Sequence, residues 1–399
     1  MFNRREVLKG AAASAAVISL PGVRLRVAHA ATGEQRLAVL ILRGGLDGLS
    51  VVPPYGDSTY YDVRPRIAVP SPDKPGGSLD LDGQFGLNRA LSPIYPIFRQ
   101  GELLFMHAVG AQHHTRSHFD AQDLLENGTA RPHGTDIGWL NRVLDVVTPR
   151  DVKRGLALGH TVPLLIRGPT PVRTWSPGFL PKVEEDFLDR LSMLYSHDEL
   201  FRNAFTEGRE SADIAGMTNP KAARKAARGK AFGVMAAQAG TLLGATDGPT
   251  IATLESTGWD THVNQVGSLK NQLGDLARGL VAFRENIGTA WNNTVLVAVS
   301  EFGRTIEENG SRGTDHGTGG IALLMGGGVV GGRVAGNWPG LVPKARFEGR
   351  DLMPTTDVRG LFKGLLRDHL GVSEEALEEV IFPGSSIAAP YEGLIRTPI

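Results

Sequence analysis

Acidic and histidine residues follow several short apolar runs of this chain, and these residue types bind divalent metal ions. Asp47, Glu301 and the pair formed by Asp260 and His262 each stand just after such a run. Because the carboxyl ends of parallel strands lie on one edge of an open α/β sheet, residues far apart in the sequence can meet there. The chain has no Cys, so a metal must bind through oxygen or imidazole ligands. We therefore predict a site for Zn, Mn, Ca or Mg with these ligands: Asp47, Asp260, His262, Glu301, Asp315 and His316.

Each of these residues also has an explanation that needs no metal. Asp47 precedes a glycine, as a turn-forming Asp often does, and Asp260 could cap the helix that follows it. Glu301 leaves a run that should be buried on both faces, where a carboxylate needs a partner, and Arg304 could be that partner. The glycine-rich loop that carries His316 could be a surface turn. The sequence alone leaves these alternatives open.

Ser117 stands where a helix is expected to begin, because it precedes an amphipathic run at 119–126 that ends at an Asn-Gly pair. The pattern Ser-x-x-Asp120 resembles a capping box, which would make the serine a simple helix cap. The partial positive charge of a helix amino terminus also suits a nucleophilic hydroxyl or an anion-binding point. Both interpretations stay open for Ser117.

Imidazole and guanidinium groups surround this serine in the sequence. His113, His114 and His118 crowd the same turn, so one or two of them are expected to support the ligands by hydrogen bonds rather than bind the metal. Arginine is a fixed cation suited to a phosphate or sulfate oxygen. We predict this catalytic set: Ser117, Arg116, Arg304 and His118.

The first residues have the pattern of an export signal. The pair Arg4 and Arg5 precedes a short apolar run, and Ala28-His29-Ala30 fits a cleavage site. The run is too short to span a bilayer permanently. We predict that residues 1–30 are a removable signal, that the twin-arginine translocase is a partner during export, and that the protein is periplasmic or secreted. An uncleaved amino-terminal anchor is the alternative.

The charge balance argues against two classes of partner. The chain has 42 Lys and Arg residues and 42 Asp and Glu residues, so no field of one sign is expected over it. Nucleic acids and anionic membranes are bound through such a field. We therefore predict neither as a partner. No second apolar stretch reaches transmembrane length, and we predict no permanent membrane span.

Short apolar runs alternate with helical patterns along the rest of the chain, which is typical of buried parallel strands connected by helices. The clearest helix covers 266–287, where apolar residues recur at spacings of three and four. We predict an α/β fold with a mostly parallel central sheet and helices on both faces. It forms one domain at 31–399 with a helical insertion at about 183–244. The predicted strands are 37–42, 103–109, 162–167, 250–255, 294–300 and 321–325.

Taken together, the motifs resemble those of a known family. They are the twin-arginine start, Arg-Gly-Gly-Leu-Asp-Gly at 43–48, Arg-Ser-His-Phe-Asp-Ala-Gln at 116–122, Gly-Trp-Leu-Asn-Arg at 138–142, Trp-Asp-Thr-His at 259–262, Ser-Glu-Phe-Gly-Arg-Thr at 300–305 and Asp-His-Gly at 315–317. With this set the chain resembles the exported DUF1501 family of unknown function, which is grouped by fold with the alkaline phosphatase and sulfatase superfamily. The resemblance runs through almost the whole chain after the signal. It implies an alkaline-phosphatase-like fold.

The superfamily resemblance also implies roles for individual positions. The superfamily order is a strand-end Asp, a Ser or Thr nucleophile at a helix start, an Asp with a nearby His, an Asp-His pair after a strand, and a final His. Glu301 and Phe302 stand where the Asp-His pair is expected, so this chain is one imidazole short. The positions that match the other four features are Asp47, Ser117, Asp260 with His262, and His316.

These observations predict an exported metal-dependent hydrolase of phosphate or sulfate esters. Ser117 would attack the central atom of a small anionic ester or sugar substrate, and Arg116 or Arg304 would stabilise the equatorial oxygens of the transferring group. The alternative is a catalytically inactive periplasmic binding or assembly protein with the same fold. The missing imidazole favours this alternative, while Ser117 at a helix start beside arginines favours the hydrolase.

Overall fold

The computed structural model describes residues 34–111, 113–147, 154–159, 161–176, 185–196, 198, 201–202, 205–206 and 232–396. The predicted export signal at residues 1–30 lies outside this part of the chain, and export therefore stays a prediction.

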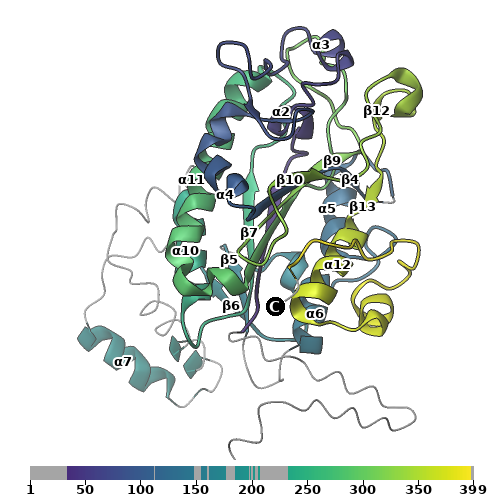
Figure 1. Ribbon diagram of the computed structural model, residues 1–399. Helices are drawn as coiled ribbons and strands as arrows, with labels where there is room; N and C mark the ends of the chain where they lie inside the picture. Colours follow the sequence, from purple (N-terminus) through teal and green to yellow (C-terminus); the bar gives the residue numbers. More distant parts are fainter. Residues whose placement is uncertain are drawn as a thin grey trace, which may run out of the picture. The chain divides into compact units, whose positions relative to one another are not determined.

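A nine-stranded sheet forms the centre of the described residues (Figure 1). Its neighbouring strands are parallel, except that β9 runs antiparallel to both β4 and β8. The predicted α/β fold with a mostly parallel sheet is thus confirmed. In spatial order the strands are β10 (Arg333–Ala335), β4 (Leu103–Gly110), β9 (Gly320–Met325), β8 (Thr294–Val299), β1 (Arg36–Arg43), β7 (Ile251–Thr257), β5 (Gly155–Leu158) and β6 (Val172–Trp175), with β13 (Thr356–Asp357) also paired to β4.

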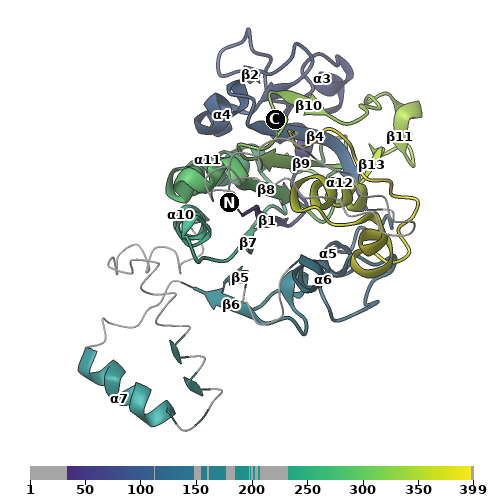
Figure 2. The same cartoon turned by 60° about the horizontal axis from the view of Figure 1, so that its bottom comes forward.

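Helices cover both faces of this sheet, as predicted (Figures 1 and 2). Side chains alternate across a strand, so each strand of the sheet contributes to two cores. In β1, Ala38 and Leu40 pack with α4 (Tyr95–Arg99), α10 (Phe232–Gly244) and α11 (Gln265–Ile287). Leu37 and Val39 belong to the other core. The helices of that second core are α5 (His118–Asn127), α6 (Trp139–Val147) and α12 (Val358–Leu370).

Shorter elements complete the described part of the chain. Two small antiparallel pairs lie outside the main sheet. These pairs and the remaining elements are β2 (Leu79–Asp80) with β3 (Gly86–Leu87), β11 (Arg346–Phe347) with β12 (Asp351–Leu352), α2 (Gly48–Val51), α3 (Thr59–Val63), α7 (Glu185–Tyr195), the 3-10 helices Arg89–Ile94, Leu164–Ile166, Gly288–Asn293 and Pro343–Ala345, and a π-helix at Ala376–Ile381.

Two sequence predictions about the strands were wrong. The run 162–167 is no strand, because Pro163 starts a short 3-10 helix at Leu164–Ile166 whose apolar residues are buried without strand pairing. The run at β9 is a strand, but it is antiparallel rather than parallel. Four short strands of the sheet, β5, β6, β10 and β13, were missed, since a run of two to four residues gives little periodicity to read.

The predicted helix at 266–287 is confirmed as α11, whose leucines at three- and four-residue spacing are buried. Of the predicted insertion at 183–244, α10 packs against α11 within the layer that covers the sheet. Its other described helix is α7, and residues 207–231 lie outside the described part of the chain. The insertion as a separate unit therefore stays a prediction.

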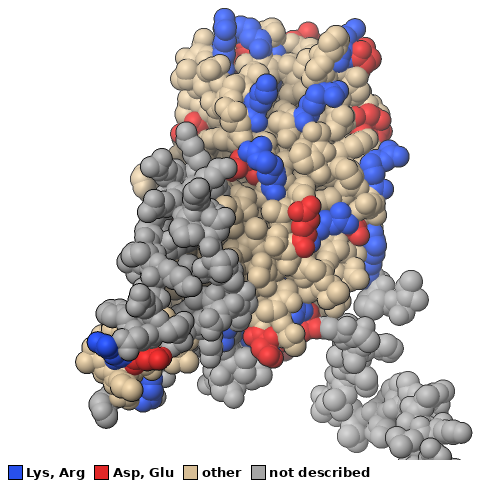
Figure 3. Space-filling view, turned by 90° about the vertical axis from the view of Figure 1, so that its left-hand side faces the viewer, with Lys and Arg blue, Asp and Glu red and all other residues tan. Residues whose placement is uncertain are grey.

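The surface carries charges of both signs. On the face shown in Figure 3, the Lys and Arg side chains are interspersed with Asp and Glu side chains. Within the described residues, no helix combines the length and the apolar character needed to cross a lipid bilayer.

The direction of β9 decides which loops meet. Parallel strands β1, β4, β7 and β8 all end at the same edge of the sheet, the upper edge in Figure 1. Because β9 is antiparallel to β8, it begins at the edge where β8 ends. The whole connection from 300 to 319 therefore stays on that edge, beside the segments that follow β1, β4 and β7.

Two buried histidines link the stability of this fold to pH. Burial lowers the pKa of His107 and of His369 to about 4. Their Nε2 atoms lie 2.8 and 2.9 Å from the carbonyl oxygens of Val52 and Arg36. In the unfolded chain each would take up a proton near pH 6.5, well before it does so in the folded chain. Acid therefore favours the unfolded state between these two pH values.

We predict that the free energy of unfolding falls as the pH drops from about 6.5 to about 4, with each histidine contributing on the order of 3 kcal/mol. His369→Gln keeps an N–H for the Arg36 carbonyl but cannot bind a proton. Its stability in urea should fall less steeply, by up to about 1.4 kcal/mol per pH unit. His113→Gln, at an exposed histidine, is the control and should follow the wild type. Parallel profiles for His369→Gln and the wild type would exclude this role.

Candidate metal centre

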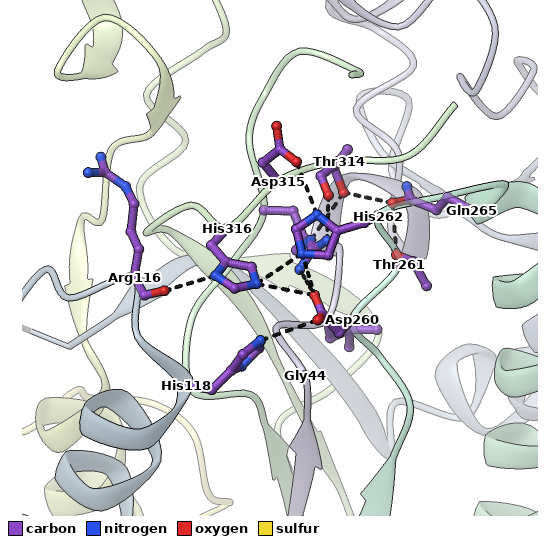
Figure 4. A network of polar contacts seen from close by, with 12 residues as sticks. Gly44, Arg116, His118, Asp260, Thr261, His262, Gln265, Thr314, Asp315 and His316 are labelled. Atoms are coloured by element: carbon purple, nitrogen blue, oxygen red, sulfur yellow. Dashed lines mark hydrogen bonds and ion pairs between the residues drawn. The ribbon is translucent and has the colours of Figure 1, made fainter. Parts of the chain in front are cut away.

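Three histidine rings and one carboxylate meet at the edge where the parallel strands end (Figure 4). Asp260 and His262 follow β7, His118 opens α5, and His316 precedes β9. The ligand atoms of His118, Asp260 and His316 lie within 4.8 Å of one another. His262 Nε2 lies 2.9 Å from Asp260 Oδ1 and 3.1 Å from His316 Nε2. These four residues are called the His-Asp cluster below.

Each ring of the His-Asp cluster is held from its outer nitrogen, Nδ1. An acceptor at Nδ1 keeps the proton there and leaves Nε2 with a free lone pair. Metal-binding histidines are typically oriented in this way by a carboxylate or a carbonyl group. The three pairs are His118 with Glu301 Oε1 at 2.7 Å, His262 with Asp315 Oδ1 at 3.0 Å, and His316 with the carbonyl oxygen of Arg116 at 2.8 Å.

The inner nitrogen atoms fit a divalent cation better than they fit one another. His118 Nε2 is buried without a hydrogen-bond partner and lies 3.5 Å from Asp260 Oδ2. His262 Nε2 and His316 Nε2 face each other at 3.1 Å, where two lone pairs would repel. Ligands ~2.0–2.1 Å from a tetrahedral Zn²⁺ lie roughly 3.3 Å apart, close to these separations. A set rich in imidazole also suits Zn²⁺ better than Ca²⁺ or Mg²⁺.

Asp260 supplies the negative charge of the His-Asp cluster. Burial raises its pKa, but the hydrogen bond and charge of Arg304 outweigh burial, so the pKa lies below its ordinary value. Arg304 Nη1 lies 2.6 Å from Asp260 Oδ1, and Arg304 Nε donates to Thr314 Oγ1. Asp260 is therefore ionised at neutral pH. Burial lowers the pKa of His316, which keeps that ring neutral and able to bind a metal.

Glu301 and Asp315 lie behind the rings rather than among the inner ligand atoms. Glu301 Oε1 accepts hydrogen bonds from Gly44 N at 2.8 Å and from Gln122 Nε2 at 2.9 Å, besides its contact with His118. Burial raises the pKa of Glu301, but these hydrogen bonds lower it by more than burial raises it, so the net pKa is below the usual range. The structure thus brings Glu301 to His118 and Asp315 to His262, where each orients a ring.

Asp47 lies apart from the His-Asp cluster, in a buried ion pair. Its oxygens lie 2.5 and 3.0 Å from Nη1 and Nη2 of Arg64, and Ser50 Oγ and Gln265 Nε2 also donate to it. Burial raises the pKa of Asp47, but Arg64 lowers it more, and the carboxylate stays charged. Protein donors therefore occupy both of its oxygens, and we leave Asp47 out of the proposed ligand set.

This ion pair fixes the loops that carry the His-Asp cluster. Gln265, which donates to Asp47, accepts the hydroxyl protons of Thr261 and Thr314 at 2.8 and 2.7 Å. Arg64 Nη2 donates to the carbonyl oxygen of Thr305 at 2.8 Å. The loop after β7 and the connection from 300 to 319 are thus attached to the same buried pair.

Glycine allows the close approach of these loops. Gly44 has a φ of +121°, and a Cβ there would lie 2.6 Å from Asp260 N. A Cβ at Gly313 would lie 2.2 Å from the carbonyl oxygen of His262. Any other residue at either position would push away the segment 260–262 that carries two members of the cluster.

Ser117 occupies the amino-terminal cap position of α5, but its side chain makes no capping hydrogen bond. Its backbone N–H donates to Thr115 Oγ1, so the capping box with Asp120 is not formed. Ser117 is a half-buried residue that lies in the sequence between Arg116, whose carbonyl holds His316, and His118 of the His-Asp cluster. The geometry therefore removes the capping explanation and leaves the nucleophile interpretation as a proposal.

The two predicted catalytic arginines are engaged by carboxylates. Arg116 donates to Asp351 Oδ2 from Nε at 2.9 Å and to Glu348 Oε2 from Nη2 at 2.7 Å. Arg304, only 2% exposed, binds Asp260 as described. Phe302, which takes the place of the expected imidazole, packs its ring against His118 and His316 at centroid distances of 4.8 and 5.0 Å.

Several supporting residues had no signal in the sequence. Arg64 lies in a long irregular region, and Gln122 lies inside a helix pattern, where polar residues are ordinary. Gln265 opens α11 and looked like any first-turn residue. Only for Glu301 did the sequence indicate a need for partners, because a carboxylate at the end of a buried strand is costly without them.

The His-Asp cluster should bind zinc. We predict one Zn²⁺ per chain in the purified, chelator-treated and reloaded protein, measured by elemental analysis and competition titration. His316→Ala removes an inner ligand and should weaken binding by more than about 100-fold, because even supporting residues are typically worth 10–100-fold. His113→Ala, at an exposed histidine, should bind like the wild type. Equal affinity of the wild type and His316→Ala would contradict the assignment.

The buried pair should be essential to stability. Arg64→Met leaves the charge of Asp47 buried without a partner, and we expect the free energy of unfolding to fall by about 3–5 kcal/mol. The matched control is Arg66→Met. Its side chain is 45% exposed, and Glu308 keeps the backbone N–H groups of residues 66 and 67 as donors, so the change should cost at most about 1 kcal/mol. Adding Asp47→Asn to Arg64→Met should recover part of the loss. Equal losses for the Arg64 and Arg66 variants in urea unfolding would refute the role.

This chain was compared with curated proteins and with solved structures. No curated protein matches it. Among solved structures, it is similar to the PsFucS1 sulfatase from Pseudoalteromonas sp. with a TM-score of 0.41 and 12% identity over 92% of this chain and 74% of that one. It is also similar to the lipoteichoic acid synthase LtaP from Listeria monocytogenes, with a TM-score of 0.36 and 11% identity over 89% and 76%. A mutant alkaline phosphatase from the Antarctic bacterium TAB5 with Mg bound gives 0.35 and 12% over 73% and 92%.

The family model described as "Protein of unknown function (DUF1501)" matches residues 34–376, which include every strand of the central sheet and all four members of the His-Asp cluster. The match confirms the family suggested by the sequence motifs, and the chain belongs to the DUF1501 family.

Proposed function

We propose that this protein is an exported, zinc-dependent hydrolase of phosphate or sulfate esters. The observation that carries the proposal is the set of three imidazole rings, each with Nδ1 bound to an acceptor and Nε2 directed towards Asp260 or its partners. Such an arrangement offers lone pairs and one negative charge to a cation. Export through the twin-arginine pathway is part of the proposal and rests on the sequence of residues 1–30.

When bound, the cation supplies Lewis-acid polarisation of the oxygens of the transferring group. The residues that would hold it are His118, Asp260, His262 and His316. Their side chains are between 25% and 41% exposed, so a small ester can approach from solvent. Phe302 closes the inner side by packing against two of the rings, which excludes water there.

Ser117 is the proposed nucleophile. Its Oγ would lose its proton and form the bond to phosphorus or sulfur while the bond to the ester oxygen breaks and the alcohol leaves with a proton. Water would then hydrolyse the serine ester and release phosphate or sulfate. It stands at the first turn of α5, where free N–H groups and the helix dipole favour developing negative charge. Its hydroxyl is not used for capping. Arg304, which holds Asp260, is the proposed cation nearest to the transferring group. The proposed substrates are small anionic esters, including esters of sugars.

A second candidate function is a binding or assembly protein that uses the same site without turnover. The observation that favours it is the state of the two arginines, because Arg116 and Arg304 are both paired with carboxylates instead of facing an anion. In that case the ion would brace the loops, and the edge would recognise an anionic sugar or a protein partner.

Ser117→Ala distinguishes the two functions. For the hydrolase, we expect turnover of an aryl phosphate, phosphodiester or sulfate ester by the zinc-loaded protein to fall by more than ~1000-fold, with zinc binding retained. Ser311→Ala, at an exposed serine of the loop 309–313, is the matched control and should keep full activity.

Two outcomes would contradict this proposal. Undiminished turnover in Ser117→Ala would reject the nucleophile. Absence of turnover with all three ester classes in a fully zinc-loaded wild type would instead favour the binding protein.

A further inference from the structure

We propose that Asp351, which lies outside the His-Asp cluster, is a positioning residue for His316 and acts through Arg116. The inference rests on the proposed metal centre. It names the residues that orient His316, one of the proposed ligands.

Asp351 begins β12 and is fully buried, with 0% of its surface exposed. Its Oδ2 accepts hydrogen bonds from Arg116 Nε at 2.9 Å and from Arg116 Nη2 at 2.7 Å. Its Oδ1 is buried without a hydrogen-bond partner, and the nearest charge is Arg350 Nε at 3.6 Å. A buried carboxylate with one unsatisfied oxygen costs free energy, so packing alone does not explain it.

Arg116 carries the effect of Asp351 to the His-Asp cluster. Its guanidinium group is attached to Asp351 and to Glu348, while its main-chain carbonyl oxygen accepts the Nδ1 proton of His316 at 2.8 Å (Figure 4). The two hydrogen bonds to the buried Asp351 anchor the side chain and fix the peptide unit of Arg116, whereas Glu348 is a solvent-exposed partner that adds little. The carbonyl is thereby held at the one position where it meets the ring.

The antiparallel pair of β11 and β12, which carries Asp351, also holds the backbone of His316. Arg350 Nη2 donates to the carbonyl oxygen of His316 at 2.6 Å. Isolated antiparallel bridges join Thr305 to Asp351 and Arg304 to His316. Residues 350–351 therefore hold the peptide of His316 directly and its ring through Arg116.

The chemical consequence is the choice of tautomer. A neutral imidazole carries its proton on either nitrogen, and only the form with the proton on Nδ1 offers Nε2 to a metal. The Arg116 carbonyl selects this form. If Asp351 is removed, Arg116 keeps only its exposed partner Glu348, so the carbonyl constrains the ring less and both tautomers become populated. Loss of such a supporting contact typically lowers metal affinity 10–100-fold.

The first test reads the tautomer in the metal-free, full-length protein by nitrogen-15 NMR of the imidazole rings. The His316 signals are assigned by their loss in His316→Gln. We expect the wild type to show His316 protonated at Nδ1 alone, and Asp351→Asn and Asp351→Ala to show a mixture. The matched control is Glu348→Gln, which removes the solvent-exposed partner of Arg116 and should leave the wild-type pattern.

The second test measures zinc affinity and the unfolding temperature of the metal-free protein for the same variants. Asp351→Asn should weaken zinc binding 10–100-fold, and Glu348→Gln less than about threefold. Arg116→Met keeps the carbonyl but loses the anchor, so it should reproduce the effect. Asp351→Asn should then add little in the Arg116→Met background, because the two residues act in series.

The outcomes separate the positioning role from the metal centre itself. An unchanged tautomer and unchanged zinc affinity in Asp351→Asn would overturn the positioning role. So would a wild type with His316 protonated at Nε2, or an affinity loss fully accounted for by the unfolded fraction. If Asp351→Ala fails to fold, Asp351→Asn and Arg116→Met decide. A wild type that binds no zinc but shows the Asp351-dependent tautomer would reject the metal centre and retain the positioning role.

Discussion

The buried ion pair between Asp47 and Arg64 is the interaction on which the arrangement of the loops depends. Two opposite charges removed from water stabilise each other only while their geometry and remaining hydrogen bonds are complete. Here further bonds go to Gln265, which begins α11 directly after the β7 loop, and to the backbone of Thr305 in the connection after β8. A displacement of either loop would leave a buried charge partly unsatisfied. The free-energy cost of such a charge opposes this displacement, so the two loops keep their relative positions although they are far apart in the sequence.

The His-Asp cluster is organised from the outside inwards. The carboxylates of Glu301 and Asp315 bind the outer nitrogens of two rings, and a main-chain carbonyl binds that of the third. This division explains why three acidic residues lie at the site although only one of them, Asp260, is an inner ligand. Phe302 packs its apolar ring against two of the imidazoles and adds no further charge to the cluster.

The sequence predicted the layers of the fold because buried strands and amphipathic helices have strong periodicities, as in β1 and α11. It also predicted that Asp260, His262 and His316 come together, because residues after parallel strands share an edge. It could not divide acidic residues between inner ligand and outer support, since Asp47, Glu301 and Asp315 have the same side-chain chemistry and differ only in their partners. Those partners, Arg64 and Gln122 among them, lie in segments where charged and polar residues are ordinary. The antiparallel direction of β9 was equally hidden, because a short apolar strand has the same pattern in either direction.

The position of β9 has a consequence for the assembly of the molecule. It lies between β4 and β8, and through β4 it connects β10 and β13 to the other five strands. Without it, the sheet would be two separate pieces, and β4 and β8 would each lose the backbone hydrogen bonds that they make with β9. His316, a member of the His-Asp cluster, lies on the loop that leads into this strand. If the cluster binds an ion as we propose, binding would select chains in which the two parts of the sheet have already joined.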